Sequence, residues 1–299
     1  HGSYSPELPN VIRELKPDIV HVHVWRHPHV FQVAKLKKEM KFKAILHGHA
    51  PFHKLSQLDP ITWTYHRLTD TLLRRALKNY DTYIALTNHE KEIAVGKLGL
   101  KEENVTVIPN GIDKDTCQPN SNRDNTILYL GRVSRAKNIH MLVKAMEMVN
   151  KDVKDAQLIV AGLDEGQVTQ LMNYARRHKV RMKYLGPVNE EQKHNLYLTS
   201  TAYALPSTYE PFGITLLEAG IHATPSVITG NGGQIYAAPP GKASLWVEPK
   251  PEKYAGAIIT LLSNRELWRK LSEGAHEHAQ DYTWDKILPK YEILYQDLQ

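Results

Sequence analysis

Two glutamates, Glu210 and Glu218, lie on either side of seven residues that begin with a Pro-Phe-Gly break. The apolar run Thr201–Pro206 just upstream predicts a short buried strand. We therefore expect Glu210 in a strand-to-helix loop and Glu218 inside the helix that follows. The first N–H groups of a helix lack internal partners and its dipole is positive there, so the helix start attracts anions. Such a corner would suit a phosphate flanked by polyols.

Two cations follow another strand-like run, Thr126–Leu130. Gly131 allows a tight turn, and Arg132 and Lys137 bracket the start of the next predicted helix. Two cations at a helix N-terminus can bind a pyrophosphate, because arginine can contact two oxygens at once. Two solvated surface cations would give the same pattern, so this alternative stays open.

Gly162 and Gly186 each end a further strand-like run. Either turn alone would be common. Together with Gly131 they fall in register along one predicted sheet edge, and α/β sheets bind ligands beyond the carboxyl ends of their strands.

Short apolar runs alternate with amphipathic segments along the chain. The strand-like runs are residues 18–23, 43–47, 82–86, 105–108, 126–130, 157–161, 182–185, 203–205 and 226–228. Helical patterns include 138–149, 166–178, 212–222 and 284–298. This alternation predicts an α/β fold with mainly parallel sheets, and the continuous apolar strands indicate burial on both faces.

A polar stretch rich in turn formers, 113–125, predicts a domain boundary. We expect α/β domains at 1–112 and 123–280, then a separate helix at 284–299. The first domain offers one helix and about four strands, where a doubly wound domain carries about six. Its first βαβ unit is therefore expected to be lacking, either because the chain is a fragment or because part of the protein is missing from it.

The composition is that of a soluble globular protein, with 41% hydrophobic and 23% charged residues in 299. The net charge of +6 suggests anionic partners, but the cations are dispersed among acids, which argues against nucleic acid. No apolar run approaches the roughly 20 residues that span a bilayer. The single cysteine, Cys117, fits a reducing compartment. A cytoplasmic protein is expected, with peripheral contact to the inner face of the membrane left open.

Four motifs follow one another along the chain: Asn110-Gly-Ile-Asp113, Gly131-Arg-x4-Lys137, the strand exit at Gly162, and Glu210-Pro-Phe-Gly-x4-Glu218. This pattern resembles glycosyltransferase family 4 (glycosyl transferases group 1), the retaining, nucleotide-sugar-dependent enzymes of the GT-B fold. Tyr282-Thr-Trp-Asp285 before the last helix is also similar to the family. The resemblance implies two Rossmann-like domains facing a cleft, with the final helix crossing back to the first.

The resemblance also implies roles for individual residues. Arg132 and Lys137 match the family's pair on the donor diphosphate. Glu210 matches the carboxylate on the donor sugar, and Glu218 the one on the ribose. The backbone of 212–214 matches the stretch that reaches the sugar and the distal phosphate. The predicted donor-binding set is Gly131, Arg132, Lys137, Gly162, Gly186, Glu210, Phe212, Gly213, Ile214 and Glu218.

His47, at the end of the predicted strand 43–47, matches the family histidine that faces the donor sugar. His49 is the alternative residue for this role. The predicted catalytic set is therefore His47, Glu210, Arg132 and Lys137. His21 and His23 would share one face of a strand, which could suggest zinc. The family is usually metal-independent and cysteine ligands are absent, so no metal site is expected. No cofactor is expected either, because the nucleoside diphosphate sugar is the substrate.

The chain departs from the family in two places. The family often has Gly-Gly-x-Pro-Glu after the second glutamate, whereas this chain keeps Gly232-Gly233 and continues Gln-Ile-Tyr236. The family's amino-terminal Gly-rich loop, which helps to bind the donor phosphate, is not found. The contacts of both loops are therefore in question.

The resemblance implies a retaining hexosyltransferase that moves a sugar from a nucleoside diphosphate to the hydroxyl of a sugar, lipid or other acceptor. A nucleotide-sugar epimerase of the same fold is the first alternative. A non-catalytic nucleotide-binding GT-B subunit or fragment is the second.

Overall fold

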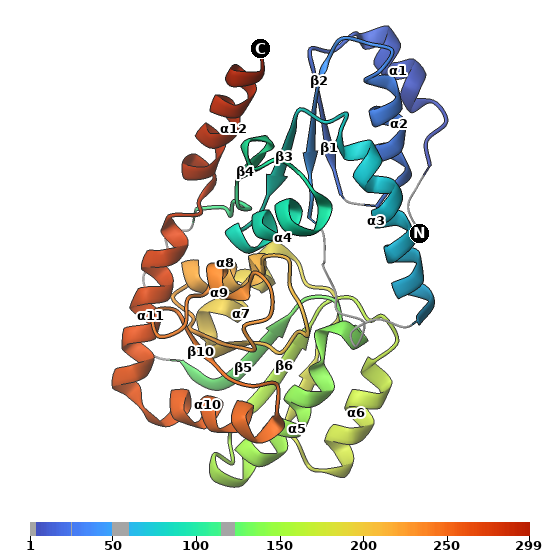
Figure 1. The fold of residues 1–299 in the computed structure, drawn as a ribbon. Coiled ribbons are helices and arrows are strands. Elements are labelled where there is room, and N and C mark those ends of the chain that lie inside the picture. The colour runs from blue at the N-terminus through green and yellow to red at the C-terminus, as the bar shows by residue number, and fades with distance from the viewer. Residues whose placement is uncertain (1–3, 25, 50–59, 115–122) are drawn as a thin grey trace. The chain divides into compact units, whose positions relative to one another are not determined.

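The computed structural model describes residues 4–24, 26–49, 60–114 and 123–299. The chain divides into two compact units, and Figure 1 traces it through both. Unit 1 comprises His1–Asn110 together with Asp285–Gln299, and unit 2 comprises Gly111–Trp284. The final helix is therefore grouped with the first part of the chain.

In its described residues, unit 1 contains four parallel strands in the order β1-β2-β3-β4. Its elements are α1 (Leu8–Leu15), β1 (Ile19–His23), α2 (Pro28–Leu36), β2 (Lys43–His47), α3 (Pro60–Leu77), β3 (Thr82–Ala85), α4 (Asn88–Leu98), η2 (Glu102–Asn104), β4 (Val105–Val107) and α12 (Trp284–Leu298), whose first residue belongs to unit 2.

Both faces of this sheet are buried, as the continuous apolar strands predict. Ala44 and Leu46 of β2 belong to a core shared with α1, α2, α3 and α4. Ile45, between them, belongs to the opposite core, where α12 contributes Ile287 and Leu294. Figure 1 shows α12 on one side of this sheet and α1 and α2 on the other. The alternation of side chains along β2 thus places successive residues in different cores.

Unit 2 contains six parallel strands in the order β10-β9-β8-β5-β6-β7. Its elements are β5 (Asp124–Leu130), η3 (Arg135–Lys137), α5 (Ile139–Asp152), β6 (Gln157–Ala161), α6 (Val168–Arg177), β7 (Met182–Tyr184), α7 (Glu190–Thr199), β8 (Ser200–Leu205), α8 (Ile214–Ile221), β9 (Ser226–Ile228), α9 (Gln234–Ala237), β10 (Ser244–Trp246), α10 (Pro251–Ser263) and α11 (Arg265–Gln280). This is the doubly wound order of a Rossmann-like sheet. The predicted α/β class with parallel sheets is confirmed.

Arg123 fixes the start of β5 by binding distant carbonyl groups. One terminal nitrogen, Nη1, donates to the carbonyl oxygens of Tyr197 and Ser200 at 2.6 and 2.9 Å, and to Thr224 Oγ1 at 2.7 Å. The other, Nη2, donates to the carbonyl oxygen of His222 at 2.8 Å. Burial lowers the pKa of Arg123 to about 10, which still leaves the group charged at neutral pH. The Arg123 guanidinium therefore satisfies carbonyl groups at the carboxyl ends of α7 and α8 and at the start of β8.

A helix start and a missed strand differ from the sequence-based expectation, each for a local reason. The helix predicted from Gly166 begins at Val168, because Gly166 has a φ of +87° and lies outside the helical region. Asp164 Oδ1 accepts the N–H groups of Gly166 and Gln167 at 2.8 Å each, which forms a turn before the helix. The edge strand β10 was not predicted, because it has only three residues and begins three positions after the turn-forming Pro-Pro-Gly241.

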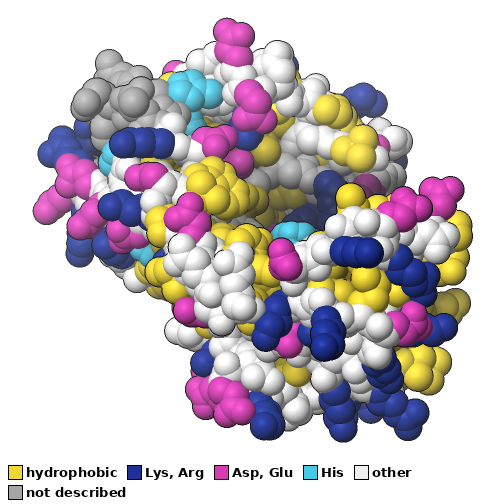
Figure 2. All heavy atoms as spheres, turned by 90° about the horizontal axis from the view of Figure 1, so that it is seen from above, with side chains coloured by type: hydrophobic (Ala, Val, Ile, Leu, Met, Phe, Trp, Pro, Cys, Tyr) yellow, Lys and Arg dark blue, Asp and Glu magenta, His cyan; other side chains and the backbone are white. Residues whose placement is uncertain are grey.

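The surface bears on the predicted partners. No helix in the described ranges is both long and apolar enough to cross a membrane. On the face that Figure 2 shows, Lys and Arg are interspersed with Asp and Glu. Helix α3 leaves Ile61, Leu68 and Leu72 largely exposed. Peripheral membrane contact stays a prediction.

Candidate functional site: the strand exits of unit 2

The strand order of unit 2 reverses between β5 and β8. From β5 the chain moves outward through β6 to β7, and from β8 it moves the other way through β9 to β10. The loops after β5 and β8 therefore diverge, which leaves the crevice where doubly wound sheets bind ligands. The two predicted motifs, one from Gly131 and one from Glu210, follow these two strands.

Hydrogen bonds join the exits of β5, β6 and β7. The Gly131 N–H donates to the carbonyl oxygen of Ala161 at 2.9 Å, and the Gly162 N–H donates to that of Gly186 at 2.8 Å. Gly162 has a φ of +130°, and a Cβ there would lie 2.0 Å from the Gly131 oxygen. A side chain at residue 162 would thus separate the exits of β5 and β6. The structure places all three predicted glycines along one edge.

Tyrosines of three strands donate hydrogen bonds to the carbonyl groups of the same loops. Tyr203 of β8 donates to the Leu130 oxygen at 2.9 Å, and Tyr129 of β5 donates to the Arg132 oxygen at 2.8 Å. Tyr184 of β7 donates to the Gly162 oxygen at 2.8 Å. Burial raises the pKa of Tyr129 and Tyr203 well above its usual range, so both hydroxyls keep the proton that they donate. The sequence pattern places these tyrosines in strands but does not indicate that their hydroxyls bind the loop carbonyls.

The two predicted phosphate cations have different surroundings. Lys137 forms an ion pair with Glu210, and both side chains are largely buried. Arg132 instead pairs with Glu165 at 2.8 Å, and its side chain is 66% exposed. The structure therefore joins Lys137 to the first glutamate of the motif, while Arg132 is held by an acid from the loop after β6. Glu165 was not among the predicted site residues.

Gly232 and Gly233 hold the backbone around Glu210. The Glu210 N–H donates to the carbonyl oxygen of Asn231 at 3.3 Å, and the Gly233 N–H donates to that of Glu210 at 2.7 Å. Gly232 has a φ of +74°, and a Cβ there would lie 2.2 Å from the Glu210 oxygen. The glycine pair that this chain keeps thus permits a close approach that a larger residue would prevent.

Gln234, where the family pattern leaves its position free, is fully buried beside this loop. Its side-chain oxygen accepts the N–H groups of Thr229 and Gly230 at 3.1 Å each. Its amide nitrogen donates to the carbonyl oxygen of Ser207 at 3.3 Å. Gln234 therefore joins the loop after β9 to the loop that carries Glu210. No local pattern in the sequence indicates this contact.

Helix α8 begins at Ile214, two residues later than predicted. Gly213 precedes it with a φ of +99°, and Phe212 lies outside the helix. The Phe212 side chain is 2% exposed and packs against Tyr282 with ring centroids 5.8 Å apart. Phe212 can therefore offer a ligand only its backbone, and the use of this segment by the donor stays a prediction. The first N–H groups of α8 lack helical acceptors.

Glu218 lies within α8, as predicted, and has two partners from α7. Its Oε2 accepts the Tyr197 hydroxyl at 3.0 Å, and its Oε1 accepts Lys193 Nζ at 3.1 Å. The Glu218 side chain is 22% exposed. These contacts fix the carboxylate and partly neutralise it. Neither Lys193 nor Tyr197 was predicted, because only the fold brings α7 beside α8.

His47, the remaining predicted residue, lies in unit 1 at the end of β2 and is 1% exposed. Its ring lies 3.9 Å from that of His49 between centroids, and 5.2 Å from that of His23. Burial and these neighbouring histidines lower the pKa of His47 to about 2 and that of His49 to about 4. Both rings are neutral at pH 7, so His47 is a buried neutral imidazole rather than a cation.

Two family models match the sequence. Glycosyl transferases group 1 matches residues 113–278, and Glycosyltransferase Family 4 matches residues 2–116. The chain belongs to the glycosyl transferases group 1 family. The resemblance found in the motifs is thereby confirmed, while the role of each site residue stays a prediction.

Among curated members, the mannosylfructose-phosphate synthase of Agrobacterium fabrum is 27% identical over 70% of this chain and 51% of its own length. A glycogen synthase of Mycobacterium tuberculosis is 27% identical over 92% of this chain and 67% of its own length. The chain thus spans about half of the first relative and two thirds of the second.

Solved structures of similar fold include the sucrose-phosphate synthase of Thermosynechococcus elongatus, with a TM-score of 0.84 and 20% identity over 97% of this chain and 76% of that one. Another is HepE of Anabaena in complex with UDP and glucose, with a TM-score of 0.83 and 18% identity over 98% of this chain and 82% of that one. At this identity the likeness concerns the fold alone, and it confirms the predicted GT-B fold for this group 1 glycosyl transferase.

Proposed function

We propose that this protein transfers a sugar from a nucleoside diphosphate donor to an acceptor hydroxyl, with retention at the anomeric carbon. The observation that carries the proposal is the buried pair of Lys137 and Glu210, which joins the exits of β5 and β8 where the strand order reverses. A cation beside a carboxylate at this point matches a ligand that carries both phosphate oxygens and sugar hydroxyls.

In the proposed binding mode, the cations of the site bind the diphosphate and the carboxylates bind hydroxyl groups. The donor diphosphate takes Lys137, Arg132 and the first N–H groups of α8, and the sugar hydroxyls take Glu210. Negative charge grows on the departing diphosphate during transfer, and preorganised cations and helix dipoles stabilise that charge. Glu218 binds the ribose hydroxyls in this proposal, with Lys193 and Tyr197 holding it in place. The reaction as proposed needs no cofactor.

The relatives suggest where to begin with the donor. HepE of Anabaena was solved with UDP and glucose, and also with UDP-glucose. We therefore propose a uridine diphosphate hexose as the first donor to test, with ADP and GDP sugars beside it. Acceptors to test include sugars, sugar phosphates and lipids.

The test compares the binding of free UDP with that of a UDP-sugar, by calorimetry on the full chain. A thermal-shift panel of nucleoside diphosphates first selects the base, because a ligand that binds the folded state raises the melting temperature. Lys137→Ala should lower the affinity for both UDP and the UDP-sugar by about 10-fold or more, since a charged hydrogen bond contributes about 1.5–3 kcal/mol. Lys151→Ala, in the last turn of α5, is the matched control and should change neither.

The two glutamates should separate the two parts of the donor. Glu210→Gln should remove the extra affinity of the UDP-sugar and leave the affinity for UDP, because only the sugar contacts Glu210 in this mode. Glu218→Gln should weaken both ligands by the same factor, because both carry ribose. Equal losses in Glu210→Gln would contradict the sugar assignment. Product analysis with donor alone, and then with acceptors, distinguishes transfer from epimerisation and from binding without turnover.

A further inference from the structure

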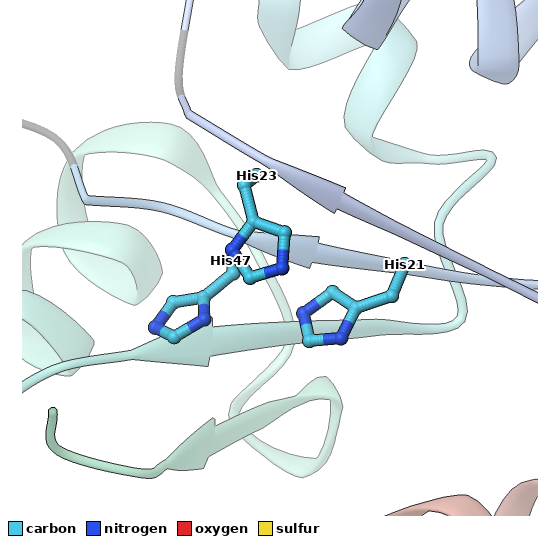
Figure 3. A group of neighbouring side chains, drawn as sticks. All are labelled: His21, His23 and His47. Atoms are coloured by element: carbon cyan, nitrogen blue, oxygen red, sulfur yellow. The ribbon is translucent and has the colours of Figure 1, made fainter. Parts of the chain in front are cut away.

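Histidines gather at the carboxyl ends of β1 and β2 in unit 1. His21 and His23 share one face of β1 because they are two residues apart, and the parallel register pairs His23 with His47. The three residues each offer a ring nitrogen, and these atoms lie within 4.8 Å of one another. Figure 3 shows the three rings beside one another on the same side of the strands. Sequence spacing alone could suggest only the His21–His23 pair.

Several nitrogens of this cluster lack the partners that burial demands. Neither ring nitrogen of His47 has a hydrogen-bond partner among the described residues, and the same is true of His21 Nε2. His47 is nevertheless 1% exposed. A buried polar group without a partner destabilises the folded state, so a ligand that accepts these lone pairs would offset that cost.

The Nδ1 atoms of His21 and His23 already have partners. His21 Nδ1 lies 2.7 Å from the Tyr295 hydroxyl of α12, and His23 Nδ1 lies 3.2 Å from His49 Nε2. Metal-binding histidines almost always use one ring nitrogen for the ion and the other for such an orienting contact. This arrangement leaves Nε2 of His21 and of His23 for the ion, together with one nitrogen of His47.

We propose that His21, His23 and His47 form a binding site for a divalent transition-metal ion, with Zn²⁺ as the best match. Neutral imidazole is a preferred ligand of zinc, and three histidines leave a fourth position for water or another ligand. Bonds of about 2.0–2.1 Å would set the nitrogens roughly 3.4 Å apart, so small side-chain rotations must close the cluster. The proposal departs from the sequence-based expectation of no metal site.

If the proposed function holds, a metal ion at this site should block the use of His47 in sugar transfer. His47 is the predicted catalytic histidine, and a ring bound to zinc can no longer offer that nitrogen to a substrate. Zinc should therefore inhibit sugar transfer, and a chelator should restore it. The binding experiment below needs neither donor nor acceptor, so it stands even if transfer is never observed.

The experiment uses the full chain without an added affinity tag, stripped of metal and titrated with Zn²⁺ by calorimetry. Co²⁺ serves as a second probe, because its visible absorption reports a four-coordinate site. We expect one ion per chain. His23→Asn should weaken binding by at least tenfold and should be tolerated by the fold, because His23 is exposed. Tyr295→Phe should weaken binding by about tenfold through loss of the orienting contact.

Two control variants locate the ion. His89→Asn removes an exposed histidine of α4, and His1→Ala removes the histidine at residue 1. Neither should change the affinity if the proposal holds. Melting curves in chelator show that each variant is folded, and His21→Asn replaces His23→Asn if the latter is not. Binding below one ion per chain, or wild-type affinity in His23→Asn and His21→Asn, would overturn the proposal.

Discussion

Replacing Gly162 with alanine should reveal how closely the exits of β5 and β6 approach each other. A Cβ at residue 162 would lie 2.0 Å from the Gly131 oxygen, where real Cβ contacts stay above 3.0 Å, so the two loops must separate by about 1 Å. The backbone at Gly162 also has a φ of +130°. The variant therefore carries both a conformational cost and a steric cost.

Gly186→Ala is the matched control, because it carries the conformational cost alone. Gly186 has a φ of +73°, and nothing lies within 4 Å of a Cβ built there. A strained backbone costs about 1–3 kcal/mol, and overpacking adds about 1–3 kcal/mol. We expect Gly186→Ala to lower the free energy of unfolding by about 1–3 kcal/mol and Gly162→Ala by about 2–6 kcal/mol.

Urea unfolding measures both losses, and calorimetry with the nucleoside diphosphate measures the effect on the site. Gly162→Ala should also weaken the binding of the nucleoside diphosphate, because the displaced Gly131 directly precedes Arg132. Gly186→Ala should leave the affinity closer to wild type. Equal losses of stability in the two variants would refute the reasoning, since they would show that the β5 and β6 loops separate at no cost.

Three further predictions concern residues that hold the framework. Gln234→Ala should lower the free energy of unfolding by about 2–4 kcal/mol in urea, because buried N–H groups lose their acceptor; a loss below 1 kcal/mol would contradict this. Arg123→Lys should cost about 2–4 kcal/mol, since an ammonium group cannot reach the same set of carbonyls; wild-type stability would show that those carbonyls find other partners. Tyr174 donates to Glu147 at 2.7 Å, and this bond raises its pKa to about 12. The folded state therefore keeps a proton that the unfolded state loses above pH 10, so the stability advantage over Tyr174→Phe should fall between pH 10 and 12 and stay constant from neutral pH to pH 9.

The sequence predicted those features that local patterns determine. The continuous apolar runs identified strands such as β2, β6 and β9 at their observed bounds. The order of strand, break and helix around Glu210 and Glu218 was also predicted, because Pro-Phe-Gly interrupts one period and starts another, although the helix begins two residues later than expected. The helix starts were less certain, since side-chain turns such as that of Asp164 decide them.

Contacts between distant segments could not be predicted. Lys193 meets Glu218, and Glu165 meets Arg132, only because helices and loops become neighbours in the folded sheet. Gln234 looks like any polar residue after two glycines. The histidine cluster depends on the register of β1 against β2, and a shift by one residue would turn His47 to the other face. Such information lies in the tertiary structure rather than in any local period.

The division of unit 1 into two chain segments affects the order of folding. Unit 2 is continuous from Gly111 to Trp284, so all of its strands are available before the last helix is synthesised. One face of the unit 1 sheet is covered by Ile287 and Leu294 of α12. During synthesis domains usually fold from the amino terminus onward, but here the earlier unit cannot bury Ile45 and Ile84 until α12 emerges. Nascent chains halted before Asp285 should therefore keep this apolar face open to chaperones.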